Sequence, residues 1–135
     1  MGDKTPSQRG RSSRTKGTDF ERFVARALQV CFPDAVVSRG LQYKDATACD
    51  VEGTVFRIEC KAQKQFNYQD VINAIEQAEA NGKKYNDDRF PIAITKKDRM
   101  PILFHGKLEH LVGIIEKHFW REPDPDDYVP IERDL

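Results

Sequence analysis

Apolar residues recur at helical spacing in three stretches of this chain of 135 residues. The first stretch begins at Thr18 and is stopped by Pro33. The second covers roughly 68–81, with Gly82 as its stop, and the third runs through 108–119. This spacing puts the apolar side chains of each stretch on one face, so it predicts three amphipathic helices.

Short runs rich in β-branched and aromatic residues predict five strands between and beside these helices. AVVSRG forms the first, DVEGTVFRIECKA forms two that turn at residues 52–54, and PIAITK and PILFHG form the last two. The resulting order is α-β-β-β-α-β-β-α. Such an order predicts an α/β fold, with helices packed on a mixed sheet.

Charge divides the chain into three parts, although its formal net charge is zero. Residues 1–17 carry five basic residues against Asp3 and show no apolar periodicity, which predicts a flexible basic arm. One folded domain is expected over 18–120. Residues 121–135 carry six acids against two arginines and are expected to form an acidic tail.

The cysteines and the hydropathy indicate where the protein works. Cys31, Cys49 and Cys60 form no CxxC pair and leave an odd thiol, which favours a reducing compartment over a disulfide framework. The sequence shows neither an apolar run long enough to span a membrane nor a signal-peptide pattern. We therefore expect a cytoplasmic protein without membrane contact.

The strand 55–62 carries an unusual set of side chains. Residues two apart share a face of a strand, so the even positions from Phe56 to Ala62 form an apolar face. Arg57, Glu59 and Lys61 lie on the other face. The simplest interpretation is a half-exposed strand with a ladder of surface charges.

Asp50 changes that interpretation. It lies nine residues before Glu59, and a hairpin turning at Gly53 brings the two carboxylates to adjacent strands. Two carboxylates repel each other unless a cation neutralises them, and Mg²⁺ prefers such oxygen ligands, with Mn²⁺ as a possible substitute. Lys61, on the same face, suits the negative charge that develops on a phosphate under attack. The pattern indicates a metal-dependent site for phosphodiester cleavage.

Glu21 is a fourth candidate, with two interpretations left open. It falls at the edge of the buried stripe of the first helix, from which a carboxylate could point across the sheet toward the metal. Thr18-x-x-Glu21 also matches a capping box, in which the glutamate caps the start of its own helix.

The chain resembles the PD-(D/E)XK nuclease superfamily over residues 16–95, through KGTDFERFVARAL, VVSRG, Asp50 and Glu59-Cys60-Lys61. Within it, the chain is most similar to the Holliday junction resolvases of archaea and their phage relatives. The resemblance implies a restriction-endonuclease-like αβββαβ core, with Glu21, Asp50, Glu59 and Lys61 as catalytic residues. It also implies metal binding by the three acids and the backbone carbonyl of Cys60.

The resemblance carries two departures and a set of expected DNA contacts. Cys49 stands where the superfamily name has proline, and the acidic tail leaves the partner surface open. The residues expected to contact DNA are Arg11, Arg14 and Lys16 in the arm, Arg39 at the end of the first strand, and Tyr43 and Lys44 in the loop before Asp50.

The expected activity is Mg²⁺-dependent cleavage of branched DNA, in a bacterial or archaeal cell or in a phage-infected host. Paired cuts in a four-way junction need two sites related by a two-fold axis, so a homodimer is expected. Two alternatives stay open: another nuclease of the same superfamily (nicking, restriction-like or exonucleolytic), and a non-catalytic nucleic-acid-binding module on this fold.

Overall fold

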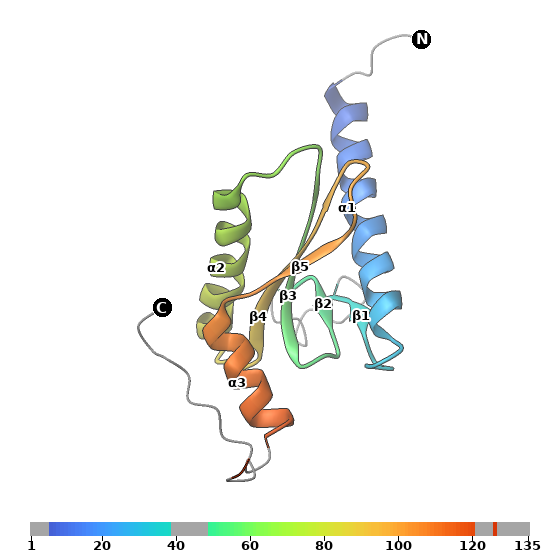
Figure 1. Ribbon diagram of the computed structural model, residues 1–135. Coiled ribbons are helices and arrows are strands. Elements are labelled where there is room, and N and C mark those ends of the chain that lie inside the picture. The colour runs from blue at the N-terminus through green and yellow to red at the C-terminus, as the bar shows by residue number, and fades with distance from the viewer. Residues whose placement is uncertain (1–5, 39–48, 121–125, 127–135) are drawn as a thin grey trace.

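A computed structural model of the protein describes residues 6–38, 49–120 and 126, with side chains from residue 16 onward (Figure 1). The elements along the chain are α1 (Pro6–Leu28), β1 (Val36–Val37), β2 (Val51–Glu52), β3 (Phe56–Gln63), α2 (Tyr68–Lys84), β4 (Phe90–Lys97), β5 (Leu103–His105) and α3 (Leu108–His118). The predicted order and the α/β class, a mixed sheet flanked by helices, are confirmed.

The five strands form one sheet in the order β1-β2-β3-β4-β5. β3 and β4 are parallel and pair along their whole length, from Phe56 opposite Phe90 to Gln63 opposite Lys97. The other pairs are antiparallel. A parallel pair needs a crossover connection, and α2 provides it. β3 therefore lies at the centre of the sheet.

Helices α1 and α2 contribute to two separate apolar clusters. Phe20 and Val24 of α1 pack in one cluster with Ile58 of β3 and with Ile92 and Ile94 of β4. The other cluster joins α2 to the β4 residue between those two isoleucines, which is Ala93. Since alternate residues of a strand point to opposite faces, the two helices cover opposite faces of the sheet.

The simpler interpretation of β3, a half-exposed strand with a ladder of surface charges, is wrong for Arg57 and Glu59. Arg57 is 1% exposed and Glu59 is 6% exposed. The Arg57 side chain lies beneath α2, where its Nε donates a hydrogen bond to the carbonyl oxygen of Ala78 (3.2 Å) and its Nη1 forms an ion pair with Asp87. A buried guanidinium is costly unless it is paired and hydrogen-bonded, as these contacts provide. The polar face of β3 is thus buried at Arg57 and Glu59 and partly exposed at Lys61.

Gly82 does not stop α2, contrary to the sequence-based expectation, because the helix continues to Lys84. Gly82 is buried, and a Cβ atom there would lie 3.1 Å from both the Arg57 Cδ and the backbone oxygen of Asp87. The glycine therefore lets the helix approach the buried arginine closely.

Helix α1 begins at Pro6 rather than at Thr18, so the expectation of an irregular arm is wrong for residues 6–17. Proline is well tolerated at the first position of a helix, since the missing N–H would have no partner there. Residues 6–17 carry no apolar side chains at helical spacing, so the hydrophobic pattern did not indicate this part of the helix.

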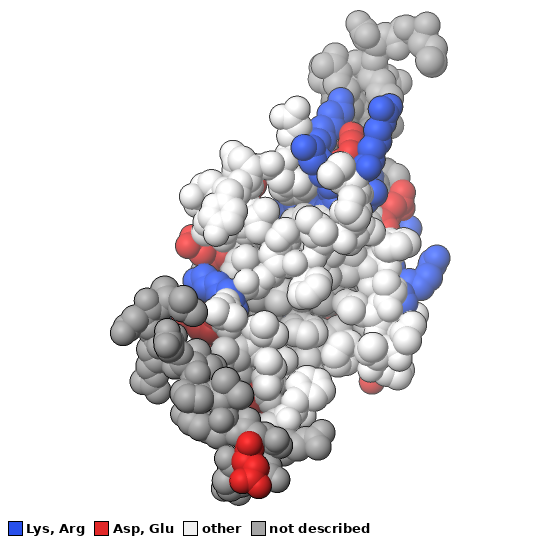
Figure 2. Space-filling view, in the orientation of Figure 1, with Lys and Arg blue, Asp and Glu red and all other residues white. Residues whose placement is uncertain are grey.

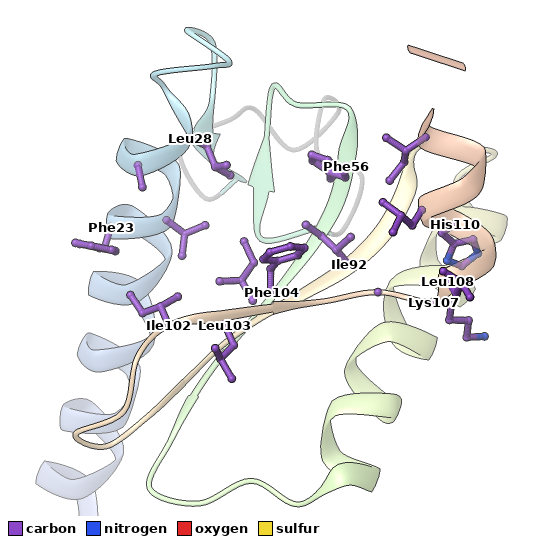
Figure 3. A pocket seen from close by; sticks show the side chains of 16 residues that line it. Phe23, Leu28, Phe56, Ile92, Ile102, Leu103, Phe104, Lys107, Leu108 and His110 are labelled. Atoms are coloured by element: carbon purple, nitrogen blue, oxygen red, sulfur yellow. The ribbon is translucent and has the colours of Figure 1, made fainter. Parts of the chain in front are cut away.

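An apolar groove lies between α1 and α3 (Figure 3). It has a volume of about 620 Å³, and its lining includes Phe23, Phe56, Ile92, Leu103 and Leu108. All eleven residues of α3 are described and none of them is buried. In the described part of the chain, no helix is long and apolar enough to cross a membrane.

Candidate active site

The candidate site is built around the middle of β3, where Glu59 and Lys61 share one face. The Lys61 Nζ lies 3.2 Å from the Glu59 Oε1, and the lysine side chain is 33% exposed while the glutamate is buried. Full pairing of β3 with β4 fixes the backbone of both residues. The lysine can therefore hold the buried carboxylate while its own head remains open to solvent.

Asp50 lies directly before β2 and is tied to β3 by two hydrogen bonds. Its backbone N–H donates to the carbonyl oxygen of Ile58 (2.9 Å). Its carboxylate Oδ2 accepts from the backbone N–H of Cys60 (2.7 Å). These bonds hold Asp50 against the segment that contains Glu59. The predicted pairing of the two acids across the turn at Gly53 is confirmed.

That turn depends on a glycine. Gly53 has φ of +84°, in the left-handed region, and a Cβ atom there would lie 2.2 Å from the backbone oxygen of Asp34. Any other residue would clash with that backbone, so Gly53 fixes how β2 returns into β3.

Glu21 lies in the middle of α1 and is 7% exposed. The capping-box interpretation of Thr18 and Glu21 is wrong, because the helix begins at Pro6 and residue 18 is internal. Glu21 is close enough to the cluster to raise the pKa of both Glu59 and Cys60 through its negative charge. Glu21 of α1, Asp50 directly before β2 and Glu59 of β3 thus lie near enough to one another for their charges to interact.

Electrostatics at this site follow from burial and crowding. Burial raises the pKa of Glu59 to about 6, and the charge of Asp50 adds to the effect, while Lys61 opposes it. Burial and the same acids raise the pKa of the Cys60 thiol well above its ordinary value, which keeps the thiol neutral. Such a cluster favours a cation beside it.

The donor set suits a hard divalent cation of the kind that the resemblance implies. Three carboxylates and the backbone carbonyl of Cys60 are oxygen ligands, which Mg²⁺ and Mn²⁺ prefer. The Cys60 side chain packs against the core cluster on the α1 side, as expected. Like-charged carboxylates keep apart, and a cation between them would remove that repulsion.

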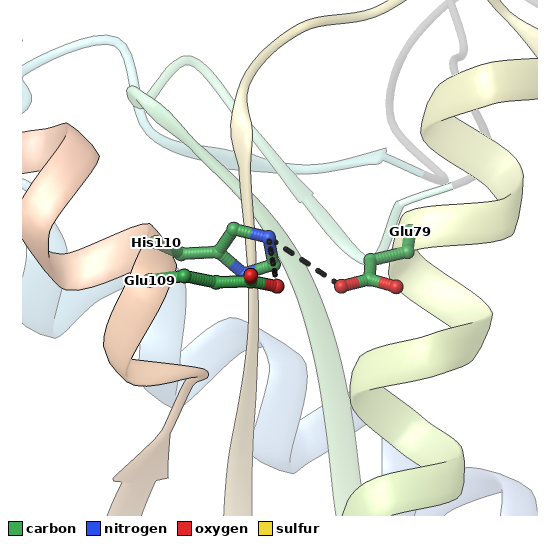
Figure 4. A group of neighbouring side chains, drawn as sticks. All are labelled: Glu79, Glu109 and His110. Atoms are coloured by element: carbon green, nitrogen blue, oxygen red, sulfur yellow. Dashed lines mark ion pairs between the residues drawn. The ribbon is translucent and has the colours of Figure 1, made fainter. Parts of the chain in front are cut away.

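Among the described residues, one group of three potential metal ligands has all its ligand atoms within 4.8 Å, and it lies elsewhere (Figure 4). It consists of Glu79 on α2 with Glu109 and His110 on α3. Glu79 Oε1 is 2.8 Å from Lys107 Nζ and 3.4 Å from His110 Nε2. Because the lysine already balances this carboxylate, the group is best described as ion pairs that join α2 to α3. No sequence motif links these residues, so sequence reasoning missed the group.

A second network of ion pairs, which the sequence did not indicate, involves the residues next to Asp50 in the chain. Arg89 forms ion pairs with Glu52 of β2 (2.9 Å) and with Asp87 (2.6 Å), and Asp87 also binds Arg57. Cys49, at the position of the superfamily proline, is buried and donates from Sγ to Glu52 Oε1 (3.0 Å). This network ties Cys49 and Glu52, on either side of Asp50 in the sequence, to Arg57 of β3 through Arg89 and Asp87.

Lys16 is the one residue of the predicted DNA contacts whose side chain is described. It is exposed and pairs with Asp98 in the turn after β4, with Nζ 2.8 Å from Oδ1. Arg39, Tyr43 and Lys44 lie outside the described residues. Arg11 and Arg14 belong to α1, but their side chains are outside the described part.

Comparison with known proteins adds no further constraint. No protein-family model matches the chain, and no curated protein or solved structure matches it either. Any functional conclusion therefore depends on the residues themselves: Glu21, Asp50, Glu59 and Lys61, held together at the centre of an α/β fold.

Proposed function

We propose that this protein is a metal-dependent endodeoxyribonuclease that hydrolyses phosphodiester bonds in branched DNA, with the four-way junction as its preferred substrate. One observation carries the proposal. Glu59 of β3 is buried and pairs with Lys61 (3.2 Å), and its pKa is raised by burial and further by the nearby charges of Asp50, directly before β2, and Glu21 of α1. Burying acids together opposes folding, so a functional reason is needed for the cluster.

Each residue of the cluster has a distinct part in this proposal. Asp50 and Glu59, with Glu21 and the Cys60 carbonyl, would hold Mg²⁺, which lowers the pKa of bound water and neutralises charge on the phosphate. Lys61 is within reach of Glu59 at 3.2 Å and is partly exposed. Its ammonium can therefore orient the attacking water and stabilise the extra negative charge of the phosphate in the transition state.

The choice of a branched substrate rests on the sequence resemblance and on a surface that suits a dimer. The apolar groove (Figure 3) includes Leu108 and Leu111 of α3 in its lining, and Ile115 and Phe119 further along the chain are exposed as well. In a two-fold interface the same patch on each subunit meets its copy, so one exposed apolar surface can serve both subunits. We propose that a second copy of this chain covers this surface, which would give two sites for paired cuts in the cytoplasm of the host.

Cleavage assays test the proposal directly. With Mg²⁺, the wild-type protein should cut a labelled four-way junction faster than a flap, a nicked duplex, a single strand or RNA. Asp50→Asn and Lys61→Ala should each lower the cleavage rate by roughly 10²-fold or more, since metal binding and charge stabilisation are lost. The Tm of Asp50→Asn should stay near that of the wild type, because the asparagine oxygen can still accept from the Cys60 N–H, whereas Lys61→Ala should lower the Tm, because it removes the cation paired with buried Glu59.

Lys83→Ala provides a matched control, since Lys83 is an exposed lysine in the last turn of α2. Its cleavage rate should equal that of the wild type. Near-normal cutting by Asp50→Asn would refute the site assignment. Tight junction binding with no cutting in Mg²⁺ or Mn²⁺ would favour the non-catalytic module, and preference for another DNA would favour a different nuclease.

A further inference from the structure

The carboxyl ends of β3 and β4, which follow Lys61 and its neighbours, carry many basic residues. β3 and β4 are parallel, so their carboxyl ends reach the same edge, with Ala62 opposite Lys96 and Gln63 opposite Lys97. The segment after β3 adds Lys64 at that edge, and the turn after β4 adds Arg99. The candidate site at Glu59 and the basic residues at the strand ends are thus close along β3 and its neighbour β4.

Helix α1 contributes to this edge across a large sequence distance. Lys16 Nζ lies 2.8 Å from Asp98 Oδ1, which joins α1 to the turn between β4 and β5. The hydrogen bond from Lys16, aided by the charges of Lys64 and Lys96, lowers the pKa of Asp98. Lys16 thus pairs directly with the Asp98 carboxylate, and Lys64 and Lys96 lie near enough for their charges to act on it. Figure 2 shows Lys and Arg side chains gathered at the end of the molecule where α1 meets this turn.

We call this set the basic edge: Lys16, Lys64, Lys96, Lys97 and Arg99. Lys16 pairs with Asp98, in the same turn as Arg99, and Lys96 and Lys97, consecutive in β4, point to opposite faces of the sheet, so the cations reach both sides of the strand ends. A surface whose charges only keep a protein soluble mixes both signs, whereas this edge concentrates one sign. Arg99 also has φ of +64°, a left-handed conformation that favours glycine, so the turn presents a cation at some cost in strain.

We propose that the basic edge binds the phosphate backbone of the duplex arm that leads away from the scissile bond. This inference rests on the proposed function, since it assumes that DNA lies across Glu59 and Lys61. Lys64 follows Lys61 by three residues, which is about 10 Å of extended polypeptide. This length corresponds to about three nucleotides along one DNA strand. Lysines contact phosphates without reading bases, so binding at the edge is independent of sequence.

Salt dependence of DNA binding tests this proposal. The variant is Lys97→Gln/Arg99→Gln, which removes two exposed cations of the edge. The matched control is Lys83→Gln/Lys84→Gln, which removes two exposed cations at the opposite end of α2. Binding to a labelled duplex is measured by fluorescence anisotropy over a salt series in Ca²⁺, and folding is checked by thermal unfolding.

Loss of two phosphate contacts should lower the slope of log affinity against log salt by about 1.8 in the edge variant, and the control should keep the wild-type slope. In Mg²⁺, with the DNA concentration varied up to saturation, the edge variant should keep kcat and show a raised KM. An unchanged slope in a protein that binds and cuts DNA would overturn the basic edge and leave the proposed function standing. A lower kcat with unchanged KM would also overturn it. A wild-type protein that binds no duplex would overturn both.

Discussion

Glu59 is a buried acid with two acidic neighbours, and this crowding has a measurable effect on the folded protein. Burial, followed by the charge of Asp50, raises the pKa of Glu59 from 4.5 to about 6. The folded state therefore holds a proton on Glu59 at pH values where the unfolded chain has already released it. Ionisation of this carboxyl thus opposes folding.

The first prediction concerns pH dependence in the presence of a metal chelator. As pH rises from about 4.5 to about 6, the wild-type protein should lose the stability that protonated Glu59 provides. Glu59→Gln keeps a neutral side chain at every pH. The Tm of this variant relative to that of the wild type should therefore increase between pH 5 and pH 7.5, as measured by scanning fluorimetry.

Glu76→Gln is the control, because Glu76 lies exposed on α2 and should give a Tm difference that is constant over the same range. A constant difference for Glu59→Gln as well would show that Glu59 is not held in a crowded, buried setting.

At the scale of the elements, the packing of α2 on the sheet includes a close contact between Gly82 and the buried Arg57 side chain. Gly82 lets this helix lie against Arg57, whose guanidinium is held by Ala78 and Asp87. The Arg57–Asp87–Arg89 network depends on this contact, because a bulkier residue would push the helix away from the buried cation. Breaking buried ion pairs is costly, since the remaining charge has no compensation.

Two glycine substitutions test this view with the same chemical change. Gly82→Ala should lower the free energy of unfolding by about 1–3 kcal/mol, since the added methyl group overpacks the contact with Arg57. Gly17→Ala in α1 should raise it by about 0.5–1 kcal/mol, because nothing lies within 4 Å and alanine favours the helix. Urea denaturation measures both. A stabilised Gly82→Ala variant would contradict the proposed packing of α2.

The order of elements could be predicted from the sequence because each helix or strand with a buried face has apolar residues at the spacing typical of that structure. The pairing of Asp50 with Glu59 followed from the same logic, applied to the turn at Gly53. The start of α1 could not be predicted, since residues 6–17 show no apolar period. The burial of Arg57 could not either, since its partner Asp87 lies thirty residues away. The ion pairs of Glu79 likewise depend on how α3 meets α2.

At the scale of the whole molecule, the apolar surface along β5 and α3 is the feature that most needs a partner. Phe104 is 81% exposed and Leu108 is 75% exposed, beside a groove of about 620 Å³. Monomeric proteins rarely leave an apolar patch of this extent in water. Among the described strands, β5 is also an edge of the sheet, the kind of strand to which another chain can add.

The corresponding prediction is a dimer that depends on this surface. Light scattering at micromolar concentration should give twice the chain mass of 15.5 kDa for the wild type and about the chain mass for Phe104→Glu, since a buried charge at a two-fold interface is strongly unfavourable. Tyr68→Glu is the control, because Tyr68 is equally exposed at 82% but lies at the start of α2. A wild-type mass near 15.5 kDa, both free and bound to a junction, would contradict the dimer.

The full pairing of β3 with β4 also determines which parts of the protein open locally. Backbone amides at the centre of a sheet exchange with water only when the whole domain opens, whereas edge strands and helix ends open locally. β3 has neighbours on both sides and a helix over each face. Glu59 and Lys61 therefore belong to the slowest-opening part of the protein. The candidate site should keep its geometry through local fluctuations and lose it only when the fold itself is lost.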